Sequence, residues 1–234
     1  MSNLPKIQYP LITIKIPSTG RDESFRWMLV REEKILLIAS ETNDDKEKKA
    51  AVRQVINNCA VSPTFKVSKL STFDLEYIFI KIRAASVSNF ADISFVDYDD
   101  KEQYPFHIDL NTVEVKFPTD VTNSVKINDQ YTITFNYPSA DLYDDPAYYE
   151  STDITDIASK CVDKIFDGDS IIDPKESSLL EIKEFFETLD QNTFANIRKF
   201  FYNLPIVYWE DKYVNKNGKE KKVVLASLTD FFTF

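Results

Sequence analysis

The chain has 234 residues, a formal net charge of −10, 18 Phe and 12 Tyr, against a single His, two Cys and three Gly. This length can form one larger domain or two modest ones, each with its own buried core. Catalytic and phosphate-binding sites depend on His, Cys and Gly, so the composition disfavours both kinds of site. The negative charge argues against a nucleic-acid or anionic-membrane binder, because phosphate contacts need clustered Lys and Arg.

No stretch of the sequence predicts a secretory signal or a membrane span. The N-terminus has no long apolar region, and the purest apolar run, Ile35 to Ala39, is far too short to cross a bilayer. Cys59 and Cys161 each fall on the apolar face of a predicted helix, which favours two reduced, buried thiols. We therefore expect a soluble, acidic, intracellular protein that binds neither nucleic acid nor membranes.

The N-terminal region predicts a β-hairpin followed by two helices. Residues Leu11 to Ile16 alternate as a half-buried strand does, and Ser24 to Leu29 return as the second strand after a Pro-Ser-Thr-Gly turn. A helix is expected from about Arg31 to Ser40. Another begins near Asn43, where acids in the first turn favour the helix dipole. Its core stripe comprises Val52, Val55, Ile56 and Cys59.

The segment from Ser71 to Asn89 predicts a helix with two apolar faces. At about 100° per residue, Asp74 and Lys81 share one charged row, and Glu76 and Arg83 share the opposite row. The segment opens with a Ser-x-x-Asp start signal. The faces between the two rows hold Leu75, Ile78, Phe79, Ile82 and Ala85 on one side and Phe73, Tyr77, Ile80, Ala84 and Val87 on the other.

A helix of this kind must be covered on both sides. If its own chain leaves one face open, a partner protein must cover that face, and the candidate contact residues are Phe73, Tyr77 and Ile80. Burying five such side chains would contribute on the order of 5–10 kcal/mol before the cost of association.

From Asp92 the hydrophobic period changes from 3.6 to 2. Strands are expected at Ile93 to Tyr98, Tyr104 to Leu110, Thr112 to Phe117 and Gln130 to Tyr137. Turn residues separate them, so the sequence predicts an antiparallel β-meander of roughly four strands.

Residues Pro138 to Asp153 lack periodicity and are rich in Asp, Tyr and Pro. One interpretation is a solvated connector. The alternative is an acidic and aromatic patch that docks on a partner, since aromatic residues are enriched at interfaces. The candidate contact residues in that case are Tyr143, Tyr148 and Tyr149.

The C-terminal region predicts three helices and a hairpin. The first helix has an apolar stripe from Ile154 to Ile165 and ends near Gly168; the second is capped by Ser177 or Ser178, with Leu179, Ile182, Phe185, Phe186 and Leu189 inward. Asn192 is expected to cap the third, which Pro205 ends. The last elements are a hairpin over Ile206–Tyr213 and Glu220–Ala226, with an Asn-Gly turn, and an amphipathic tail over residues 227–234.

Together these elements predict an α+β fold. It consists of an N-terminal β-hairpin, helices and an antiparallel β-meander, followed by a C-terminal helical region that ends in a β-hairpin. The expected division is an α+β domain over residues 1–137, an acidic–aromatic connector over residues 138–153, and a helical region over residues 154–234.

The usual enzyme and metal motifs are missing from the sequence. His107 would have to serve any histidine-based mechanism, and its strand context favours a solvent-facing side chain. The segment from Asp167 to Asp173 lacks the Gly and the ligands that an EF-hand needs at Ile171, Ile172 and Ser178. We predict no catalytic, metal-binding or cofactor-binding residues.

Five lysines cluster in the C-terminal hairpin, at Lys212, Lys216, Lys219, Lys221 and Lys222. The simpler interpretation is a solvated hairpin whose charges prevent edge aggregation. The alternative is a contact for an acidic partner surface, since charge steers protein encounters. Its candidate residues are Lys219, Lys221 and Lys222.

Several stretches, taken together and in order, resemble the baseplate protein family of T-even-type, contractile-tailed bacteriophages. The resemblance spans nearly the whole chain. It is carried by Pro17–Gly20, Phe25–Leu37, Val55–Cys59, Phe73–Ser86, Phe201–Pro205 and Leu228–Phe232. None of these motifs is catalytic.

The resemblance implies a phage tail-assembly protein, made late in infection in the host cytoplasm and present in the virion baseplate if it is retained. That family includes a baseplate hub subunit and a related hub-assembly factor, so the implied partners are other hub or central tail proteins, with homo- or hetero-oligomers possible. Sequence alone leaves three further readings open: an assembly chaperone absent from the virion, a tail-associated cell-wall hydrolase, and a host-interaction adaptor.

Overall fold

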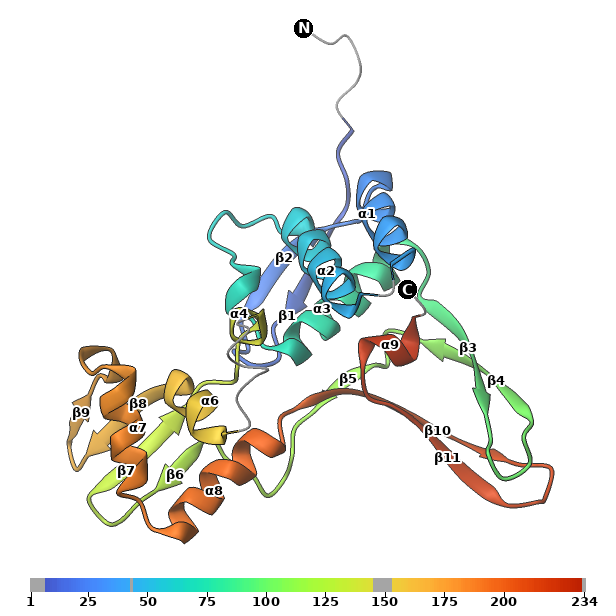
Figure 1. Ribbon diagram of the computed structural model, residues 1–234. Coiled ribbons are helices and arrows are strands. Elements are labelled where there is room, and N and C mark those ends of the chain that lie inside the picture. The colour runs from blue at the N-terminus through green and yellow to red at the C-terminus, as the bar shows by residue number, and fades with distance from the viewer. Residues whose placement is uncertain (1–6, 43, 145–152, 233–234) are drawn as a thin grey trace, which may run out of the picture. The chain divides into compact units, whose positions relative to one another are not determined.

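The structure is a computed structural model that describes residues 7–42, 44–144 and 153–232. The chain forms two compact units (Figure 1). Unit 1 comprises residues 1–116 and 206–234, and unit 2 comprises residues 117–205, so unit 2 is inserted into the sequence of unit 1. This mixed arrangement of helices and small antiparallel sheets confirms the predicted α+β class.

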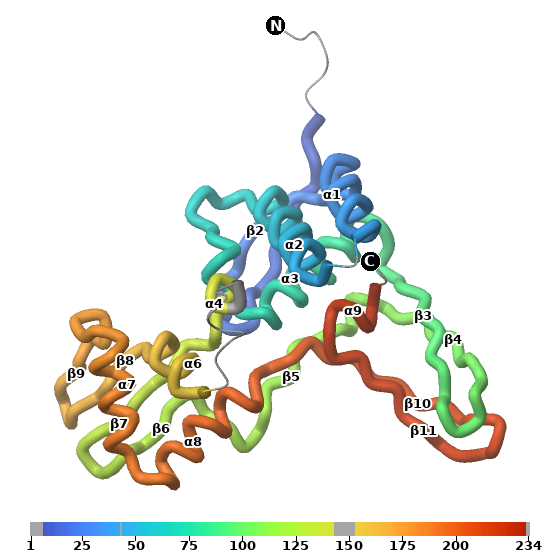
Figure 2. Tube along the Cα trace, in the orientation of Figure 1, coloured from blue at the N-terminus to red at the C-terminus, as the bar shows by residue number. Residues whose placement is uncertain are grey.

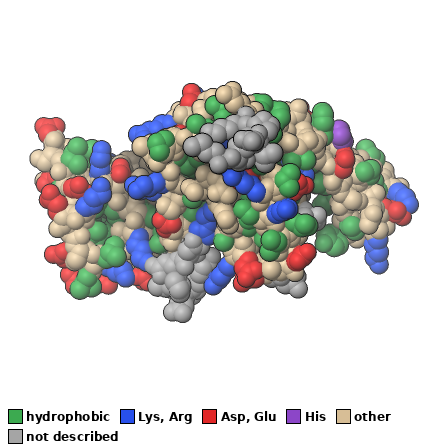
Figure 3. Space-filling view, turned by 90° about the horizontal axis from the view of Figure 1, so that it is seen from above, with side chains coloured by type: hydrophobic (Ala, Val, Ile, Leu, Met, Phe, Trp, Pro, Cys, Tyr) green, Lys and Arg blue, Asp and Glu red, His purple; other side chains and the backbone are tan. Residues whose placement is uncertain are grey.

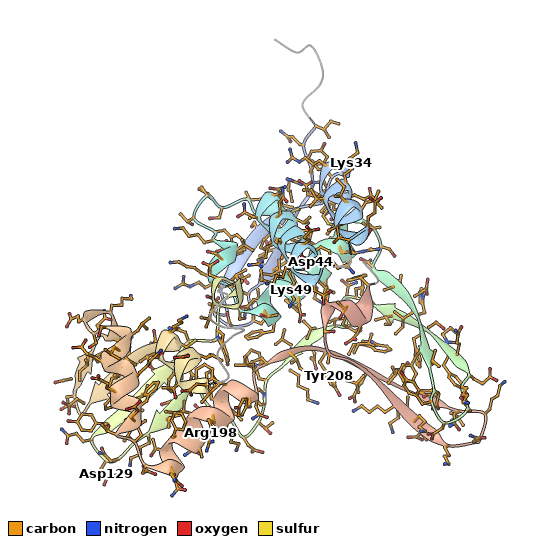
Figure 4. The ribbon with its side chains drawn as sticks, in the orientation of Figure 1. Lys34, Asp44, Lys49, Asp129, Arg198 and Tyr208 are labelled. Atoms are coloured by element: carbon orange, nitrogen blue, oxygen red, sulfur yellow. The ribbon has the colours of Figure 1, made fainter. Side chains whose placement is uncertain are left out.

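The N-terminal elements of unit 1 follow the sequence pattern closely. Strands β1 (Leu11–Lys15) and β2 (Asp22–Arg26) pair in an antiparallel hairpin. Helix α1 spans Val30–Ser40 and helix α2 spans Asp45–Cys59, with Asp44 capping α2 by accepting the amide of Lys46 (Figure 4). The predicted core stripe of α2 is buried: Val52, Val55, Ile56 and Cys59.

Helix α3 (Thr72–Ser86) follows the short 3₁₀ turn η1 (Val67–Lys69). Its N-cap is Ser71, whose side chain accepts the amide of Asp74, as the start signal predicted. Asp74 in turn accepts the amide and the hydroxyl of Ser71, which completes a capping box.

Unit 1 also contains two sets of strands. Strands β3 (Phe90–Val96) and β4 (Gln103–Asp109) form a two-stranded hairpin. Strand β10 (Ile206–Val214) pairs with β11 (Glu220–Leu225) on one side and with the short β5 (Glu114–Lys116) on the other. The tube in Figure 2 follows both long hairpins from end to end. Helix α9 (Leu228–Phe231) closes the unit.

Unit 2 is a four-stranded antiparallel sheet packed with helices. The sheet order is β6 (Ser124–Lys126), β7 (Tyr131–Phe135), β8 (Val162–Asp167) and β9 (Ser170–Ile172). The helical elements are α4 (Ala140–Asp144), α6 (Ile154–Cys161), η2 (Pro174–Glu176), α7 (Leu179–Glu187) and α8 (Gln191–Tyr202). The core joins sheet and helices through Val125, Ile133, Phe135, Ile182, Phe186, Ile197, Phe200 and Phe201.

The observed boundaries differ from the predicted division at residues 137 and 154. Strand β7 pairs with β8, so residues 124–135 belong with the helices that follow them. Strand β10 pairs with β5, so the C-terminal hairpin belongs to the N-terminal unit. The expected four-stranded meander does not form, because its predicted strands belong to three separate sheets.

Three local predictions in unit 2 are also corrected. The helix beginning at Ile154 ends at Cys161, and its expected last turn is strand β8. Helix α8 is capped by Asp190, which accepts the amides of Asn192 and Thr193, and not by Asn192. Leu179, expected to face the core, is exposed.

Candidate protein-interaction surfaces

One charged row of α3 anchors two loops of unit 1. The Asp74 carboxylate accepts the backbone amide of Ser18, from the turn after β1, at 2.9 Å. The Lys81 ammonium donates to three backbone carbonyls, those of Leu110 at 3.0 Å and of Asn111 and Val113 at 2.8 Å each. Desolvation by burial lowers the pKa of Lys81. This row therefore fixes segments of the chain's own fold.

The opposite charged row of α3 anchors the C-terminal helix. The Glu76 carboxylate accepts the backbone amide of Leu228 at 3.3 Å, and the Arg83 guanidinium lies 4.9 Å from the centre of the Phe232 ring. Burial raises the pKa of Glu76 to about 7, further raised by the nearby Asp230 and opposed by the Leu228 amide and Lys49. The second row thus binds residues 228–232.

The chain's own residues cover most of both apolar faces of α3, so the condition under which a partner would have to cover this helix is not met. Phe73 and Ile80 are buried, and they serve as core residues. Tyr77 is half-buried, with the Lys81 ammonium 5.0 Å from its ring centre. The residues proposed on this face therefore offer little surface to another protein.

The β3–β4 and β10–β11 hairpins are held together by aromatic side chains, and we call this pair of hairpins the arm. The Tyr213 ring of β10 lies 4.5 Å from Tyr104, 5.8 Å from Phe106 and 6.0 Å from Phe95 between ring centres. Trp209 adds an edge contact to Phe106 at 6.1 Å. Offset and edge-on rings of this kind are favourable beyond their buried area.

Polar contacts lock the turns of the two hairpins together at the tip of the arm. Asn215 donates from its side chain to Asp97 at 3.2 Å. The backbone amide of Lys216 donates both to the Asp100 carboxylate at 2.9 Å and to the Tyr104 hydroxyl at 2.8 Å. Burial and the hydrogen bond to Asp100 raise the pKa of Tyr104 to about 12, so its hydroxyl stays protonated and able to bond at neutral pH.

Intramolecular ion pairs occupy most of the predicted basic patch. Lys221 pairs with Asp99 in the opposite turn, and Lys222 pairs with Glu210 on the neighbouring strand. Lys222 also lies 5.9 Å from the ring of Tyr208, which Figure 4 labels on β10. Within the described part of the chain, Lys219 is exposed and forms no ion pair. Carboxylates of the chain itself, on β10 and β11 and in the β3–β4 turn, therefore neutralise four of the five lysines.

The tip of the arm presents one aromatic side chain to solvent. Tyr98, in the turn between β3 and β4, is 89% exposed, while the residues around it are held by the contacts just described. Val96 and Val214 on the same arm are also exposed. The sequence predicted Tyr98 as the last residue of a strand over Ile93 to Tyr98, but β3 ends at Val96 and Tyr98 lies in the turn that follows.

Two of the three tyrosines proposed in the connector lie outside the described residues, namely Tyr148 and Tyr149. Tyr143 belongs to helix α4, so part of the expected connector is helical.

The residues considered for chemistry are placed as follows. His107 is exposed on β4, with Nδ1 2.6 Å from Asp92 and its ring stacked on Phe90 at 4.5 Å; it is the purple side chain in Figure 3. Burial raises the pKa of Cys59 to about 11 and of Cys161 to about 12, which keeps both as protonated thiols.

No group of three or more His, Cys, Asp and Glu side chains in residues 7–42, 44–144 and 153–232 is placed to hold a metal ion. Over the same residues, no helix is both long and apolar enough to cross a membrane.

Comparison with known proteins identifies the chain's family. The family described as "T4 bacteriophage base plate protein" matches residues 9–233, which include nearly all of both units. No curated protein and no solved structure matches the chain. The match also agrees with the motifs that carried the resemblance in the sequence. This chain is therefore a member of the T4 bacteriophage base plate protein family.

Proposed function

We propose that this protein is a non-enzymatic component of the baseplate hub, acting as a structural subunit or assembly factor through contacts with hub and central tail proteins. The observation that carries the proposal is the family match across residues 9–233. It is supported by the way the charged residues of α3 are used, since their hydrogen bonds to backbone groups hold the fold together.

The arm is the surface of unit 1 that we assign to partner binding. Its two hairpins are joined by tilted and edge-on aromatic rings and by Asn215, so Tyr98 is displayed on a framework that loses little freedom on binding. Exposed tyrosines on rigid supports are frequent hot spots of interfaces. We expect Tyr98 to insert into a pocket of a neighbouring baseplate protein.

The test is co-expression with each hub and central tail protein of the same phage, followed by size-exclusion chromatography. We expect a hetero-complex whose affinity falls about tenfold or more in Tyr98→Ala. The matched control is Tyr202→Ala, which removes another exposed tyrosine, in this case from unit 2. Equal affinities for the two variants would remove the arm from the proposal, and the absence of any complex with any tail protein would remove the proposal itself.

Mass spectrometry of purified virions separates the two forms of the role. A structural subunit is present in a fixed ratio to the other hub proteins. An assembly chaperone is present in infected cells and missing from the particles.

A further inference from the structure

We propose that the open edge of strand β9, together with the start of helix α7, binds an extended, basic and apolar segment of a partner protein as an added β-strand. This inference rests on the proposed function, because it names the chemistry of one partner segment. It concerns a different unit and different residues from the arm.

The core-facing side of the sheet in unit 2 is covered on its first strands and becomes exposed at β9. Val125, Ile133, Ile165 and Ile172 lie opposite one another on the four successive strands. The first two are buried and Ile165 is half-buried, whereas Ile172 is 41% exposed. The apolar row therefore continues to an edge that the described helices of unit 2 leave partly exposed.

The start of α7 extends the same apolar character. Leu179 lies one turn before the buried Ile182 on the same helix face, yet it is 48% exposed, and Leu180 beside it is 64% exposed. The 3₁₀ turn η2 joins β9 directly to this helix, and both lie at the same end of unit 2 (Figure 1). With Ile171, which is 58% exposed, the four aliphatic side chains fall within ten residues of sequence.

The backbone of β9 is oriented to accept another strand. Among the described strands β9 pairs with β8 alone. The two-residue turn at Gly168, where φ is +57°, makes Asp167 and Ser170 the closing pair of the hairpin. Because hydrogen-bonded and non-bonded pairs alternate along an antiparallel ladder, the amide and carbonyl of Ile171 are directed away from β8. Strand addition uses such groups for affinity.

The distribution of charge identifies the occupant as basic. Residues 117–205 contain 17 Asp and Glu against 7 Lys and Arg, a net charge of −10, whereas the remainder of the chain contains 21 of each and is neutral. Beside the edge, Asp169, Asp173 and Glu176 are exposed. A second copy of this chain would place the same acids against themselves, so the edge repels itself and attracts a strand that carries Lys or Arg.

The probe for the test is a short synthetic peptide in which Lys alternates with Val, added to the full chain and followed by fluorescence anisotropy. We expect the probe to bind, and the same peptide with Glu in place of Lys not to bind. In the double variant Asp169→Lys, Glu176→Lys the dissociation constant should rise about tenfold or more. The matched control, Glu184→Lys with Glu187→Lys, makes the same change in net charge on exposed residues of α7 and should leave it within about twofold.

Hydrogen exchange distinguishes strand addition from simple charge attraction. Exchange of the Ile171 amide should slow when the probe binds, and N-methylation of alternate probe amides should abolish binding. The proposal would be overturned if both double variants lost the same affinity for the probe, or if the Ile171 amide exchanged at the same rate with and without the probe. So would a dimer of the chain formed through β9 in place of probe binding.

This failure can be told apart from failure of the proposed function. If a hub protein binds the Asp169→Lys, Glu176→Lys variant as tightly as the unaltered chain and the probe does not bind, the β9 edge is excluded while the hub role stands. If the probe binds and no tail protein does, the hub role falls and the edge remains a binding site for basic strands.

Discussion

Arg26 and Glu32 form a bidentate ion pair beneath the start of α1. The two guanidinium nitrogens lie 2.8 Å and 3.1 Å from the two carboxylate oxygens, and Glu32 is 0% exposed. Arg31 at 2.8 Å and the amide of Leu29 at 2.9 Å complete the set of donors around the carboxylate. Burial alone would raise the pKa of Glu32, but these donors hold it at about 2. Both residues lie in the Phe25–Leu37 stretch that resembles the phage family, so this part of the resemblance is structural.

We predict that Arg26→Met lowers the free energy of unfolding at pH 7 by about 3–5 kcal/mol, because it leaves a buried carboxylate without its main partner.

Since the pKa of Glu32 is about 2 in the folded protein and near 4.5 when unfolded, the stability that ionised Glu32 provides is present above pH 4.5 and lost as pH falls towards 2. Urea unfolding of Glu32→Gln at pH 7 and pH 3 measures this. The difference in the free energy of unfolding between Glu32→Gln and the unaltered protein should be smaller at pH 3 than at pH 7. An equal difference at the two pH values would contradict the pairing. Glu33→Gln, at the exposed neighbouring position, is the control.

Glu76 should show the opposite dependence on pH. Its pKa is about 7 in the folded protein, above the unfolded value of 4.5, so the protonated form stabilises the fold fully below pH 4.5 and this contribution disappears as pH rises through 7. Glu76→Gln keeps an acceptor for the Leu228 amide and removes the buried charge. We expect it to increase the free energy of unfolding at pH 8 by about 2 kcal/mol and to have little effect at pH 5. An unchanged melting temperature at pH 8, with Glu41→Gln measured alongside, would show that the carboxylate is solvated.

Lys81→Met tests the anchoring of the 110–113 loop. The substitution retains the aliphatic stem but removes the donors to three carbonyls, so we expect a loss of about 2–3 kcal/mol in the free energy of unfolding. Lys34, labelled on α1 in Figure 4, is exposed, and Lys34→Met is the matched control with an expected change within about 0.5 kcal/mol. Equal effects in the two variants would mean that the loop does not depend on Lys81.

His107→Ala addresses the alternative of a tail-associated hydrolase. His107 is exposed and contacts only Asp92 and the Phe90 ring among the interactions of the described residues, so it is not positioned on a nucleophile. We expect phage carrying this substitution to form plaques normally, and the purified protein to cleave no peptidoglycan. Loss of plaques with a variant that folds normally would instead support a histidine-based mechanism.

Local signals in the sequence predicted the helices better than the sheets. The caps at Ser71 and Ser178 and the stripe of α2 depend on residues a few positions apart, and the structure confirms them. The predicted stripe from Ile154 ran too far because Val162 and Ile165 continue its helical spacing, whereas the pairing of both residues with β7 places them in strand β8. No local sequence pattern predicts that β5 pairs with a strand that begins at Ile206.

The candidate surfaces show the same division between local and distant information. The two rows on α3 were visible in the sequence, but their partners at Ser18, Leu110 and Leu228 are far away along the chain. The sequence therefore left open whether the chain itself or a partner covers this helix. The lysines of the C-terminal hairpin were visible too, and Asp99, which neutralises Lys221, lies in a different hairpin. Tyr98 is exposed because it lies in the turn after β3, and Ile171 is exposed because β9 is an edge strand. Neither position can be read from local sequence.

The pairing of β5 with β10 has a consequence for how the protein is made. Ribosomes deliver residues 1–116 first, yet their sheet partner and the segment that covers Glu76 and Arg83 arrive only after all of residues 117–205 have been synthesised. Unit 2 can thus fold while unit 1 is still incomplete and part of the α3 surface is uncovered. This is contrary to the usual order, in which the N-terminal domain folds first. A chain whose translation stops before Ile206 would therefore lack the strand that pairs with β5 and the segment that contacts Glu76 and Arg83.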